Sequence, residues 1–459
     1  MAAKLNKGEV VEVRIHDLAF GGAGIGRVEG FVVFVKGAVT GDVVRARDFK
    51  RKQNHAEAEL VEIVSPSPDR IEAPCPYFGV CGGCSWQSIA YQKQLETKRN
   101  LVLQALEHIG GQKGCEASPI LPSPAEYRYR NKMDMTFGVA SDRDRALGFH
   151  RPNDFKRILD IEACLLEPES LDRAEQVCRR FALENDLSFY DPITHKGLMR
   201  HLMMRHSVTT DEMVVVVSSA TPPPDKTPDY AALAGRLREA CPKLRAFLWG
   251  SDDNVADVMK IERILYSEGE DRLEERLGET RFQISSQSFF QTNTRAAKVL
   301  YDAISDCLDL DGAKTVLDAY CGTGSIGIYC AARAKAVWGL ELVKEAVWDA
   351  RANAALNGLD NCRFIAGDIR RTLRLAVEQM KGRPDCVIVD PPRGGMHKKA
   401  LAGLIQLAAP IFIYVSCNPT TLSRDLVEIM TQGYRLTRVQ PVDLFPQTYH
   451  VETICRFER

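Results

Sequence analysis

From residue 276 onward, short runs of apolar residues alternate with longer amphipathic stretches. The apolar runs have strand length and predict strands near 315–318, 336–341, 364–365, 385–389, 411–415, 434–440 and 449–457. The stretches 294–308, 326–334 and 345–357 have helical spacing. Alternation of this kind is typical of a doubly wound sheet with crossover helices, so we expect an α/β domain over residues 276–459.

In the first 66 residues the predicted elements are short strands that follow one another closely, without helices between them. Val10–Ile15, Phe31–Val35 and Val43–Arg47 predict strands, and the glycines at 21, 22, 24 and 26 are interpreted as a turn-rich loop. Short strands at close spacing with glycine between them favour a small OB-like β-barrel. Ser65–Pro68 then predicts a linker.

Residues 67–275 mix both periods and predict a central α+β domain. A helix is expected from Ala90 to about His108, ended by Gly110-Gly111, and strands are expected over Tyr127–Phe137 and Met213–Val217. The chain is therefore expected to be a multidomain α/β protein divided into residues 1–66, 67–275 and 276–459.

Composition narrows the class of protein. The chain has 459 residues, of which 45% are hydrophobic and 26% charged, as in ordinary globular domains. No apolar run approaches the ~20 residues that span a bilayer, and the N-terminal residues lack the apolar core of a signal peptide. We therefore expect no membrane contact, a cytoplasmic location, no obligate protein partner and a monomer.

Net charge is −1 and does not decide for or against nucleic acid, but basic residues gather locally. Arg45–Lys52 holds five basic residues and one acidic residue, and Arg128–Arg157 interleaves cations with aromatic residues. Such segments can neutralise phosphates and stack on bases, which suggests RNA binding. A solvated strand face is the plainer alternative for each segment alone.

Reactive side chains follow the predicted strands of the C-terminal region. One apolar run ends in Ser416-Cys417-Asn418-Pro419, another ends in Asp390-Pro391-Pro392-Arg393, and His450-Val451-Glu452 lies in the last predicted strand. Open α/β sheets bind ligands at the carboxyl ends of their strands. A thiol, a carboxylate and a base in these places suggest covalent catalysis.

A glycine-rich loop, Asp318–Gly327, joins the first strand of this sheet to the next helix. Glu341 ends the second strand, where a carboxylate can accept from both ribose hydroxyls, and Asp368 after the third strand could accept from an adenine amino group. The spacing of Gly322, Gly324 and Gly327 also fits a dinucleotide fingerprint, so NAD is a rival ligand. S-adenosylmethionine is favoured, because the loop begins with an acidic residue and a nicotinamide enzyme has no use for a strand-end cysteine beside Asp-Pro-Pro-Arg.

The fourteen cysteines are not a disulfide framework in a chain expected to be cytoplasmic. Those in apolar runs are interpreted as core residues: Cys178, Cys307, Cys330, Cys362, Cys386 and Cys455. Cys75, Cys81 and Cys84 lie in a Pro- and Gly-rich loop and can converge on one metal, with Cys164 as the first and Cys115 as the second candidate for a fourth ligand. Zinc or an iron–sulfur cluster would satisfy these thiols. A redox pair at Cys81 and Cys84 is disfavoured, because thioredoxin-like βαβ surroundings are missing.

Together these residues resemble the RNA uridine-5-methyltransferases, in the subgroup with an N-terminal TRAM barrel and an iron–sulfur cluster. The resemblance covers nearly the whole chain and rests on ordered motifs: the four cysteines, Phe289–Asn293, Asp318–Gly327, Asp390–Arg393, Ser416–Pro419 and His450–Glu452. It implies a TRAM barrel and a central domain that bind RNA, with a [4Fe–4S] cluster rather than zinc. It also implies a Rossmann-like domain that binds S-adenosylmethionine.

The resemblance also assigns roles to single residues. Cys417 matches the nucleophile and Glu452 the base. The matching cluster ligands are Cys75, Cys81, Cys84 and Cys164. The positions that match S-adenosylmethionine contacts are Gln291, Tyr320, Ser325, Glu341, Asp368 and Asp390. The sequence departs from many relatives at Gln447, where they have His, and from some relatives at Ser325 and Asp368.

The implied reaction is methylation of carbon 5 of a uridine. A Cys417 thiolate, expected to form in an electropositive site, adds to carbon 6, and Glu452 later removes the carbon 5 proton. Arg393 is a further candidate for stabilising charge on the uracil oxygen. The resemblance points to 23S ribosomal RNA, with transfer RNA as a rival. An RNA cytosine-5 enzyme would typically carry a second cysteine at Asp390, and a non-catalytic RNA-binding or assembly factor would not use Cys417 and Glu452.

Overall fold

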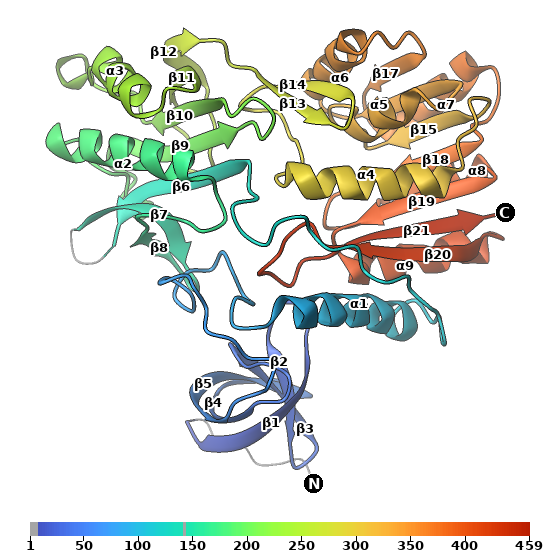
Figure 1. Ribbon diagram of the computed structural model, residues 1–459, viewed down its shortest axis with the longest axis horizontal. Coiled ribbons are helices and arrows are strands. Elements are labelled where there is room, and N and C mark those ends of the chain that lie inside the picture. Colours follow the sequence, from blue (N-terminus) through green and yellow to red (C-terminus); the bar gives the residue numbers. More distant parts are fainter. Residues whose placement is uncertain (1–7, 141–143) are drawn as a thin grey trace.

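The computed structural model describes residues 8–140 and 144–459 (Figure 1). Residues 1–7 of the expected barrel and residues 141–143 of the Arg128–Arg157 segment lie outside the described part. Within it the chain forms a closed barrel, a mixed sheet in the middle of the sequence and a C-terminal sheet flanked by helices. No helix of the described part is long and apolar enough to cross a membrane.

The N-terminal barrel closes in the strand order β1-β2-β3-β5-β4. Its strands are β1 Val10–Leu18, β2 Gly24–Val28, β3 Phe31–Lys36, β4 Val43–Arg51 and β5 His55–Ser65. The inward side chains of Val13, Val33 and Val44 are fully buried, or nearly so, and make the barrel core. The expected β-barrel is confirmed.

The interpretation of the first glycines as one loop is wrong for Gly24 and Gly26, which lie in strand β2. A Cβ atom on Gly26 would stand 2.1 Å from Cγ1 of Val13, and one on Gly24 would stand 2.9 Å from Cγ2 of Ile15. The small barrel therefore needs glycine where β2 crosses β1, because no side chain fits between them.

The expected linker at Ser65–Pro68 is firmly held. Strand β5 continues to Ser65, and the backbone N–H of Ser67 donates to Oδ1 of the buried Asp42 at 2.8 Å. Arg70 donates to the same carboxylate at 2.5 Å. These bonds fix the exit of the chain from the barrel, and they lower the pKa of Asp42 despite its burial.

The middle sheet has the strand order β12-β11-β10-β9-β6-β7-β8. Its strands are β6 Lys132–Val139, β7 Arg145–Arg151, β8 Asp154–Asp160, β9 Met199–His206, β10 Met213–Ser219, β11 Leu244–Ser251 and β12 Arg263–Gly269. Helices α2 (Glu169–Glu184) and α3 (Tyr230–Ala240) pack together on one face, and the short helix η1 (Pro224–Lys226) precedes α3.

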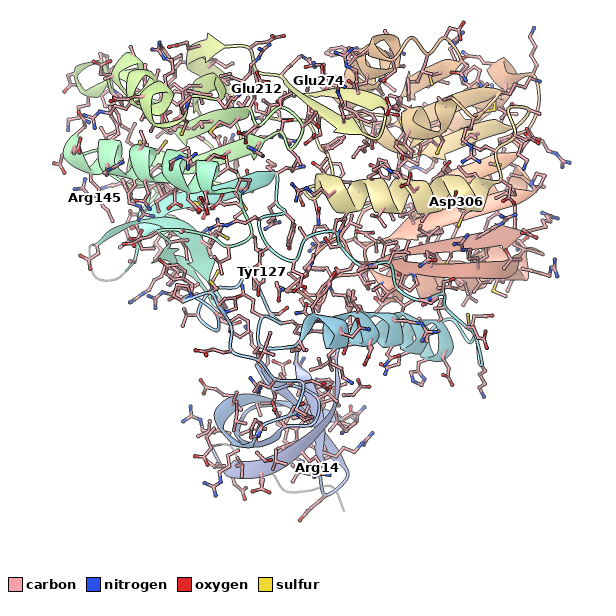
Figure 2. The ribbon with its side chains drawn as sticks, in the orientation of Figure 1. Arg14, Tyr127, Arg145, Glu212, Glu274 and Asp306 are labelled. Carbon is pink, nitrogen blue, oxygen red and sulfur yellow. The ribbon has the colours of Figure 1, made fainter. Side chains whose placement is uncertain are left out.

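The strand expected over Tyr127–Phe137 begins only at Lys132. Arg128 has a positive φ of 52°, and the hydroxyl of the buried Tyr129 donates to the carbonyl of Pro446 at 3.0 Å. This segment connects the middle sheet with the C-terminal region, and Tyr127 lies near the centre of the molecule (Figure 2). Its aromatic residues therefore serve contacts between parts of the chain instead of strand pairing.

The C-terminal sheet has the strand order β17-β16-β15-β18-β19-β21-β20. Its strands are β15 Thr315–Ala319, β16 Ala336–Glu341, β17 Cys362–Ala366, β18 Cys386–Val389, β19 Ile411–Ser416, β20 Arg435–Val442 and β21 Glu452–Glu458. β15 to β19 are parallel, and β21 runs antiparallel between β19 and β20. The predicted doubly wound α/β fold is confirmed.

Helices cover both faces of this sheet, as the apolar clusters on its two sides require. They are α4 Thr294–Leu308, α5 Ser325–Ala331, α6 Lys344–Leu356, α7 Ile369–Met380, α8 Lys398–Gln406 and α9 Pro419–Thr431. A hairpin of β13 (Leu273–Leu277) and β14 (Thr280–Ile284) leads into α4. Helix α1 (Tyr91–His108) packs against α9 and β20, between the C-terminal sheet and the barrel (Figure 1).

Candidate active site

Cys417 and Glu452 lie at one end of the C-terminal sheet, on neighbouring strands. Strand β19 ends at Ser416, which pairs with Thr453 of the antiparallel strand β21. The next opposed positions are Cys417, which directly follows β19, and Glu452, the first residue of β21. Directly opposed residues of antiparallel strands have Cα atoms about 4.5–5.5 Å apart, so this register places the thiol and the carboxyl side by side. Asp390 follows β18, the other neighbour of β19.

The turn after Cys417 is built by hydrogen bonds. Asn418 caps α9 by accepting from the backbone N–H of Thr420 at 3.0 Å, and Pro419 is the first helical residue. The amide of Asn418 also donates to the carbonyl of Arg393 at 3.1 Å. This bond ties the Asp-Pro-Pro-Arg segment to the cysteine turn, so Asn418 and Pro419 have structural roles in the motif that follows β19.

The electrostatic setting of Cys417 differs from the expected electropositive site. Burial, with Glu452 and Asp390 nearby, raises the pKa of the Cys417 thiol to about 11, and Arg393 is the cation that opposes this rise. Burial also raises the pKa of Glu452 and of Asp390. The thiol is therefore protonated in the resting protein, chiefly because burial disfavours the charged thiolate.

His450 stands two residues before Glu452, and its ring lies 4.3 Å from that of Tyr449. Burial and the cations Arg393, Lys98 and Arg130 lower the pKa of His450 to about 4. The imidazole is therefore neutral at physiological pH and can accept a proton or a hydrogen bond, but it supplies no positive charge to the thiol.

The glycine-rich loop runs from the end of β15 into α5. Asp318 is 1% exposed, and the backbone N–H of Gly327 donates to its Oδ2 at 3.0 Å. Tyr320 has a positive φ of 67°, as do Gly322 and Gly324 at 54° and 75°. Asp318 thus holds the two ends of the loop together, and burial raises its pKa to about 8.

Glu341 ends β16 beside this loop. Its Oε2 accepts from the backbone N–H of Gly322 at 3.0 Å, and its Oε1 accepts from that of Val343 at 2.9 Å. Both oxygens are thereby oriented at the carboxyl edge of the sheet, where a ribose would approach. The neighbouring side chain of Leu342 is 68% exposed, which leaves an apolar surface next to the carboxylate.

Three of the other expected cofactor contacts, Ser325, Asp368 and Gln291, have partners within the protein. The Ser325 hydroxyl shares a 2.7 Å hydrogen bond with Tyr301, and Asp368 caps α7 and pairs with Arg370, which lowers its pKa. Gln291 is 8% exposed, and its carbonyl accepts from Asn131 at 2.9 Å. Tyr320, Ser325, Glu341, Asp368 and Asp390 all follow or end strands β15 to β18 or begin the next helix, whereas Gln291 lies on the loop before α4.

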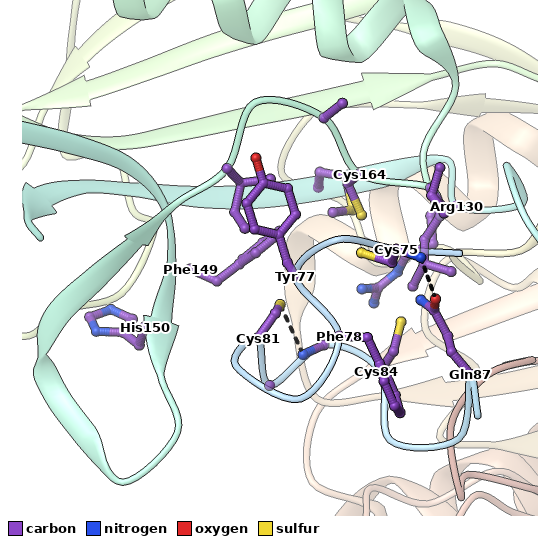
Figure 3. Close-up of a pocket in the computed structure, with 17 residues that line it drawn as sticks. Cys75, Tyr77, Phe78, Cys81, Cys84, Gln87, Arg130, Phe149, His150 and Cys164 are labelled. Carbon is purple, nitrogen blue, oxygen red and sulfur yellow. Dashed lines mark hydrogen bonds between the residues drawn. The ribbon is translucent and has the colours of Figure 1, made fainter. Parts of the chain in front are cut away.

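Cys75, Cys81, Cys84 and Cys164 line one cavity of about 300 Å³, which we call the cysteine cavity (Figure 3). The first three stand on the loop after the barrel, and Cys164 comes from the segment between β8 and α2. The backbone N–H of Cys75 donates to Gln87, and that of Cys164 donates to Asp172. Cys115, the alternative fourth ligand, does not line this cavity and lies near Cys455 instead.

The distances between the four sulfur atoms can be compared with those of a zinc site. Zinc binds thiolates at about 2.3 Å, so tetrahedral ligation needs sulfur atoms about 3.8 Å apart. Among the described residues, no three of these sulfurs lie within 4.8 Å of one another. Burial raises the pKa of Cys84 to about 11 and that of Cys164 to about 12, so a bound metal must displace their protons.

The segment Asp443–His450, which we call the strap, leads into Glu452 and is clamped by helix α1. Lys98 and Asp443 are fully buried and form an ion pair of 2.6 Å, and the Lys98 ammonium also donates to the carbonyl of Phe445. Gln94 and Gln447 exchange two hydrogen bonds of 2.9 Å. Gln94 and Lys98 were not singled out from the sequence alone. They lie one helical turn apart beside the apolar face of α1, and this spacing could have indicated a shared buried polar contact.

The strap also contacts the cysteine cavity. The carbonyl of Gln447 accepts from the backbone N–H groups of Ser85 and Trp86, both at 3.0 Å. These residues directly follow Cys84, so the loop that carries three of the thiols bonds to the segment that leads into the expected base, Glu452. Gln447, which stands where many relatives have His, is 2% exposed and has a φ of 67°. Its role here is structural, because it connects helix α1, the loop after Cys84 and the strap.

Replacing Lys98 with methionine is expected to lower the free energy of unfolding by about 3–5 kcal/mol, because the carboxylate of Asp443 stays buried without its cation. Urea unfolding monitored by circular dichroism measures the loss. Lys93→Met on the same helix is the control: Lys93 is partly exposed, and its ion pairs should contribute less than about 1 kcal/mol. Equal midpoints for the two variants would contradict the expectation.

Arg45, Arg47 and Lys52, in the first basic segment, are paired on the barrel surface. They contact Glu62, Glu59 and Glu57 of β5 at 3.0, 2.6 and 3.2 Å. The plainer interpretation of this segment, a solvated strand face with balanced charge, is therefore favoured over a concentrated phosphate-binding patch.

Comparison with known proteins places these features in context. Residues 269–459 match the family described as tRNA (Uracil-5-)-methyltransferase, and residues 4–61 match the TRAM domain. An uncharacterized RNA methyltransferase of Caldanaerobacter subterraneus is 40% identical over 453 residues and covers 99% of both chains. One of Chlorobaculum tepidum is 39% identical over 475 residues, covering 99% of this chain and 98% of its own.

One solved structure resembles this chain in fold over nearly its whole length. It is the Pyrococcus abyssi tRNA (uracil-54, C5)-methyltransferase in complex with S-adenosyl-L-homocysteine, with a TM-score of 0.78 and 27% sequence identity. The superposition covers 97% of this chain and 100% of that one. S-adenosyl-L-homocysteine is what remains of S-adenosylmethionine after its methyl group is transferred, so this neighbour supports the methyl donor expected from the glycine-rich loop.

Proposed function

Because the chain belongs to the S-adenosylmethionine-dependent RNA uracil-5-methyltransferases, we propose that it methylates carbon 5 of a specific uridine through a covalent adduct with Cys417. The observation that carries this proposal is the strand register that sets Cys417 beside the buried Glu452 at the carboxyl edge of the sheet. A nucleophile and a base in adjacent positions are what addition and elimination at one pyrimidine ring require.

In the first step Cys417 forms a bond from Sγ to carbon 6 of the uracil. The thiol is protonated at rest, so its proton must leave as the bond forms. Asp390, within electrostatic reach of the thiol, is the acceptor, which leaves Glu452 unprotonated for the last step. Arg393 would stabilise the negative charge that the addition places on the uracil oxygen. S-adenosylmethionine supplies the methyl group that carbon 5 then accepts.

In the last step Glu452 takes the proton from carbon 5. The electron pair of that C–H bond restores the ring double bond, and the bond from carbon 6 to Sγ of Cys417 breaks, which frees the thiolate. Burial suits Glu452 to this task, because a carboxylate with a raised pKa is a stronger base than an exposed one. The methyl donor is proposed to lie against Gln291, Tyr320, Ser325, Glu341, Asp368 and Asp390.

Glu452→Gln is expected to lower the rate of methyl transfer by about 10²–10⁴-fold, because the amide cannot accept the carbon 5 proton. In the wild type the rate should rise with pH as Glu452 ionises. Single-turnover kinetics from pH 5 to about 9 measure both effects, with trapped Cys417–RNA adduct as the species that accumulates in the variant.

The same variant has an opposite effect on stability. When the pKa of a carboxyl is higher in the folded than in the unfolded state, the protonated carboxyl favours the fold. This contribution is fully present below the unfolded-state pKa of about 4.3 and is lost as the pH rises through the folded-state pKa. Glu452→Gln does not ionise, so it should be more stable than the wild type at pH 8, by about 1.4 kcal/mol per unit of raised pKa. Wild-type activity in Glu452→Gln, or lower stability at pH 8, would count against the assignment.

We propose that Cys75, Cys81, Cys84 and Cys164 hold a [4Fe–4S] cluster. The donor set is four thiols, the cavity they line is larger than one ion needs, and the resemblance to cluster-bearing relatives favours iron and sulfide over zinc. The cluster would supply structural cross-linking, because the reaction transfers no electron. It would keep the loop that bonds to Gln447 in place beside the strap.

The proposed division of work follows the three parts of the chain. Residues 1–66 and 67–275 would grip RNA, and residues 276–459 would hold the methyl donor and perform the chemistry. The target uridine must leave its helix or stack to reach Cys417, which favours loops and splayed bases as substrates.

We propose a uridine of 23S ribosomal RNA as the target, because the resemblance to cluster-bearing relatives points there. Transfer RNA is the second candidate, favoured by the name of the Pyrococcus abyssi neighbour. The deciding experiment maps 5-methyluridine in both RNAs from a strain that lacks the gene, followed by transfer of labelled methyl groups from S-adenosylmethionine to each RNA by the purified protein. A missing modification restored in either RNA identifies the substrate, and no incorporation into either would overturn the proposed function.

A further inference from the structure

A second cavity, of about 500 Å³, lies between the middle sheet and the loop before α4. We call it the junction cavity. Its polar walls carry the cations Arg130, Lys132 and Arg205 with one carboxylate, Asp134, and its aromatic walls include Phe149 and Phe289. It shares Arg130, Met133 and Phe149 with the cysteine cavity but contains none of the four thiols.

Arg205 is the least satisfied cation of this cavity. It is 2% exposed, and one guanidinium nitrogen, Nη2, donates to the carbonyl of Ser288 at 2.6 Å. Its Nε and Nη1 are buried without a hydrogen-bond partner. Burial lowers the pKa of Arg205 to about 10, so the group stays charged at physiological pH. A buried guanidinium with two unused donors is costly unless a ligand supplies acceptors.

The acidic groups near Arg205 do not supply hydrogen-bond acceptors to its guanidinium. Asp134, Asp271 and Glu275 face it electrostatically, but none of them makes a hydrogen bond to it. Asp134 pairs with Lys132 at 3.0 Å, and Asp271 binds Ser286. On the cavity wall itself three cations face one carboxylate, so the cavity suits an anion.

The aromatic wall of the cavity suits a base. Phe289 is 70% exposed, although large apolar side chains usually avoid water, and Phe149 is partly buried on β7. A nucleobase stacked on an exposed aromatic ring gains about 1–3 kcal/mol. Cations for a phosphate beside rings for a base match one nucleotide of a single-stranded segment.

The junction cavity adjoins the loop that carries Gln291. Asn131, between Arg130 and Lys132, bonds to Thr292 and to the carbonyl of Gln291, the expected cofactor contact on the same loop as Phe289. Arg130 also acts on the pKa of His450 in the strap. A nucleotide held here would therefore belong to the chain segment next to the target uridine.

We propose that the junction cavity binds a nucleotide that flanks the target uridine, with its phosphodiester on Arg205, Lys132 and Arg130 and its base against Phe149 or Phe289. The inference rests on the proposed function, because it assumes an RNA substrate with a uridine at Cys417. The contact would position the strand as the uridine is turned out, and it would contribute to the choice of substrate.

The test compares Lys132→Met and Arg205→Met with Arg238→Met, which removes an exposed cation on α3 and serves as the control. The probe is a fluorescent transcript of the RNA segment that the wild type methylates. We expect about 10-fold weaker binding of the RNA for Lys132→Met and Arg205→Met, and a salt dependence reduced by about 0.7 in log–log slope for each lost phosphate contact. Affinity for S-adenosyl-L-homocysteine and the thermal midpoint of Lys132→Met should stay at wild-type values.

A second arm locates the phosphate. Each transcript carries one neutral methylphosphonate at a single position on either side of the target uridine. One of these transcripts should bind the wild type less tightly than the unmodified RNA does. Lys132→Met should bind that transcript and the unmodified RNA with equal affinity. Uridine monophosphate and inorganic phosphate compete in parallel, and displacement of RNA by either at micromolar concentration would assign the cavity to a free anion instead. Unchanged RNA affinity and salt slope in both Lys132→Met and Arg205→Met, with normal methylation by the wild type, would overturn the cavity assignment alone. Absence of methylation by the wild type would overturn the proposed function first.

Discussion

Replacing Cys417 with alanine is expected to abolish methyl transfer, with kcat lowered by at least about 10⁴-fold, as for other covalent nucleophiles. The thiol forms the bond that makes carbon 5 reactive, and alanine offers no substitute for it. Transfer of labelled methyl groups from S-adenosylmethionine to RNA measures the loss. RNA substituted with 5-fluorouracil provides a second readout. Carbon 5 then carries fluorine in place of the hydrogen that the base removes, so the elimination cannot occur and the adduct with Cys417 should persist.

The matched control is Cys115→Ala, which removes a thiol that lies outside both the strand-end site and the cysteine cavity. It should methylate RNA at the wild-type rate and form the fluorouracil adduct. Methyl incorporation that survives Cys417→Ala would refute the covalent mechanism. Incorporation without any adduct from the wild type would instead direct attention to a base other than uracil.

Replacing Cys164 with alanine is expected to remove the cluster and, with it, most of the activity. Protein purified without oxygen should contain about four iron and four sulfide per chain, and Cys164→Ala should contain much less of both. The activity should fall by about 10²-fold, although the cluster does no chemistry, because the loop after Cys84 would no longer hold the strap in place. Iron and acid-labile sulfide assays, together with a thermal midpoint, separate these effects.

Cys115→Ala is again the control, since it was the competing fourth ligand. It should retain the iron content, the visible absorbance and the thermal midpoint of the wild type. Iron retained in Cys164→Ala and lost in Cys115→Ala would reverse the ligand assignment. Zinc in place of iron in the anaerobic wild-type protein would contradict the cluster itself.

The fold of the C-terminal region was predictable because its signals are local. Helix 294–308 was expected with the bounds that α4 has, and every strand expected between 315 and 457 has a counterpart in the sheet. Each buried parallel strand is a short apolar run, and each crossover helix is an amphipathic stretch, so their alternation along the chain predicts the doubly wound fold. Strand ends then locate Cys417, Asp390 and Glu341 at one edge of the sheet without any knowledge of distances.

The errors in the N-terminal and middle regions arose where contacts distant in sequence override local preference. Gly24 and Gly26 look like a loop, but they form a strand because β1 leaves no room for a side chain. Tyr127–Asn131 looks like the start of a strand, but its residues bond to the strap and to the loop before α4. The electropositive site expected around Cys417 also failed, because the charge at a thiol depends on which carboxyl groups fold next to it.

Residue types and their order along the chain were thus sufficient for the α/β fold, the family and the list of candidate residues. The spacing of the four sulfurs, the register of Cys417 against Glu452 and the clamp of Lys98 on Asp443 required the folded chain. Lys98 and Asp443 are separated by 345 positions, and the junction cavity is lined from the middle sheet and from the loop before α4. Periodicity reports which face of an element is buried, but only packing decides which distant side chains share that burial and so set one another's charge.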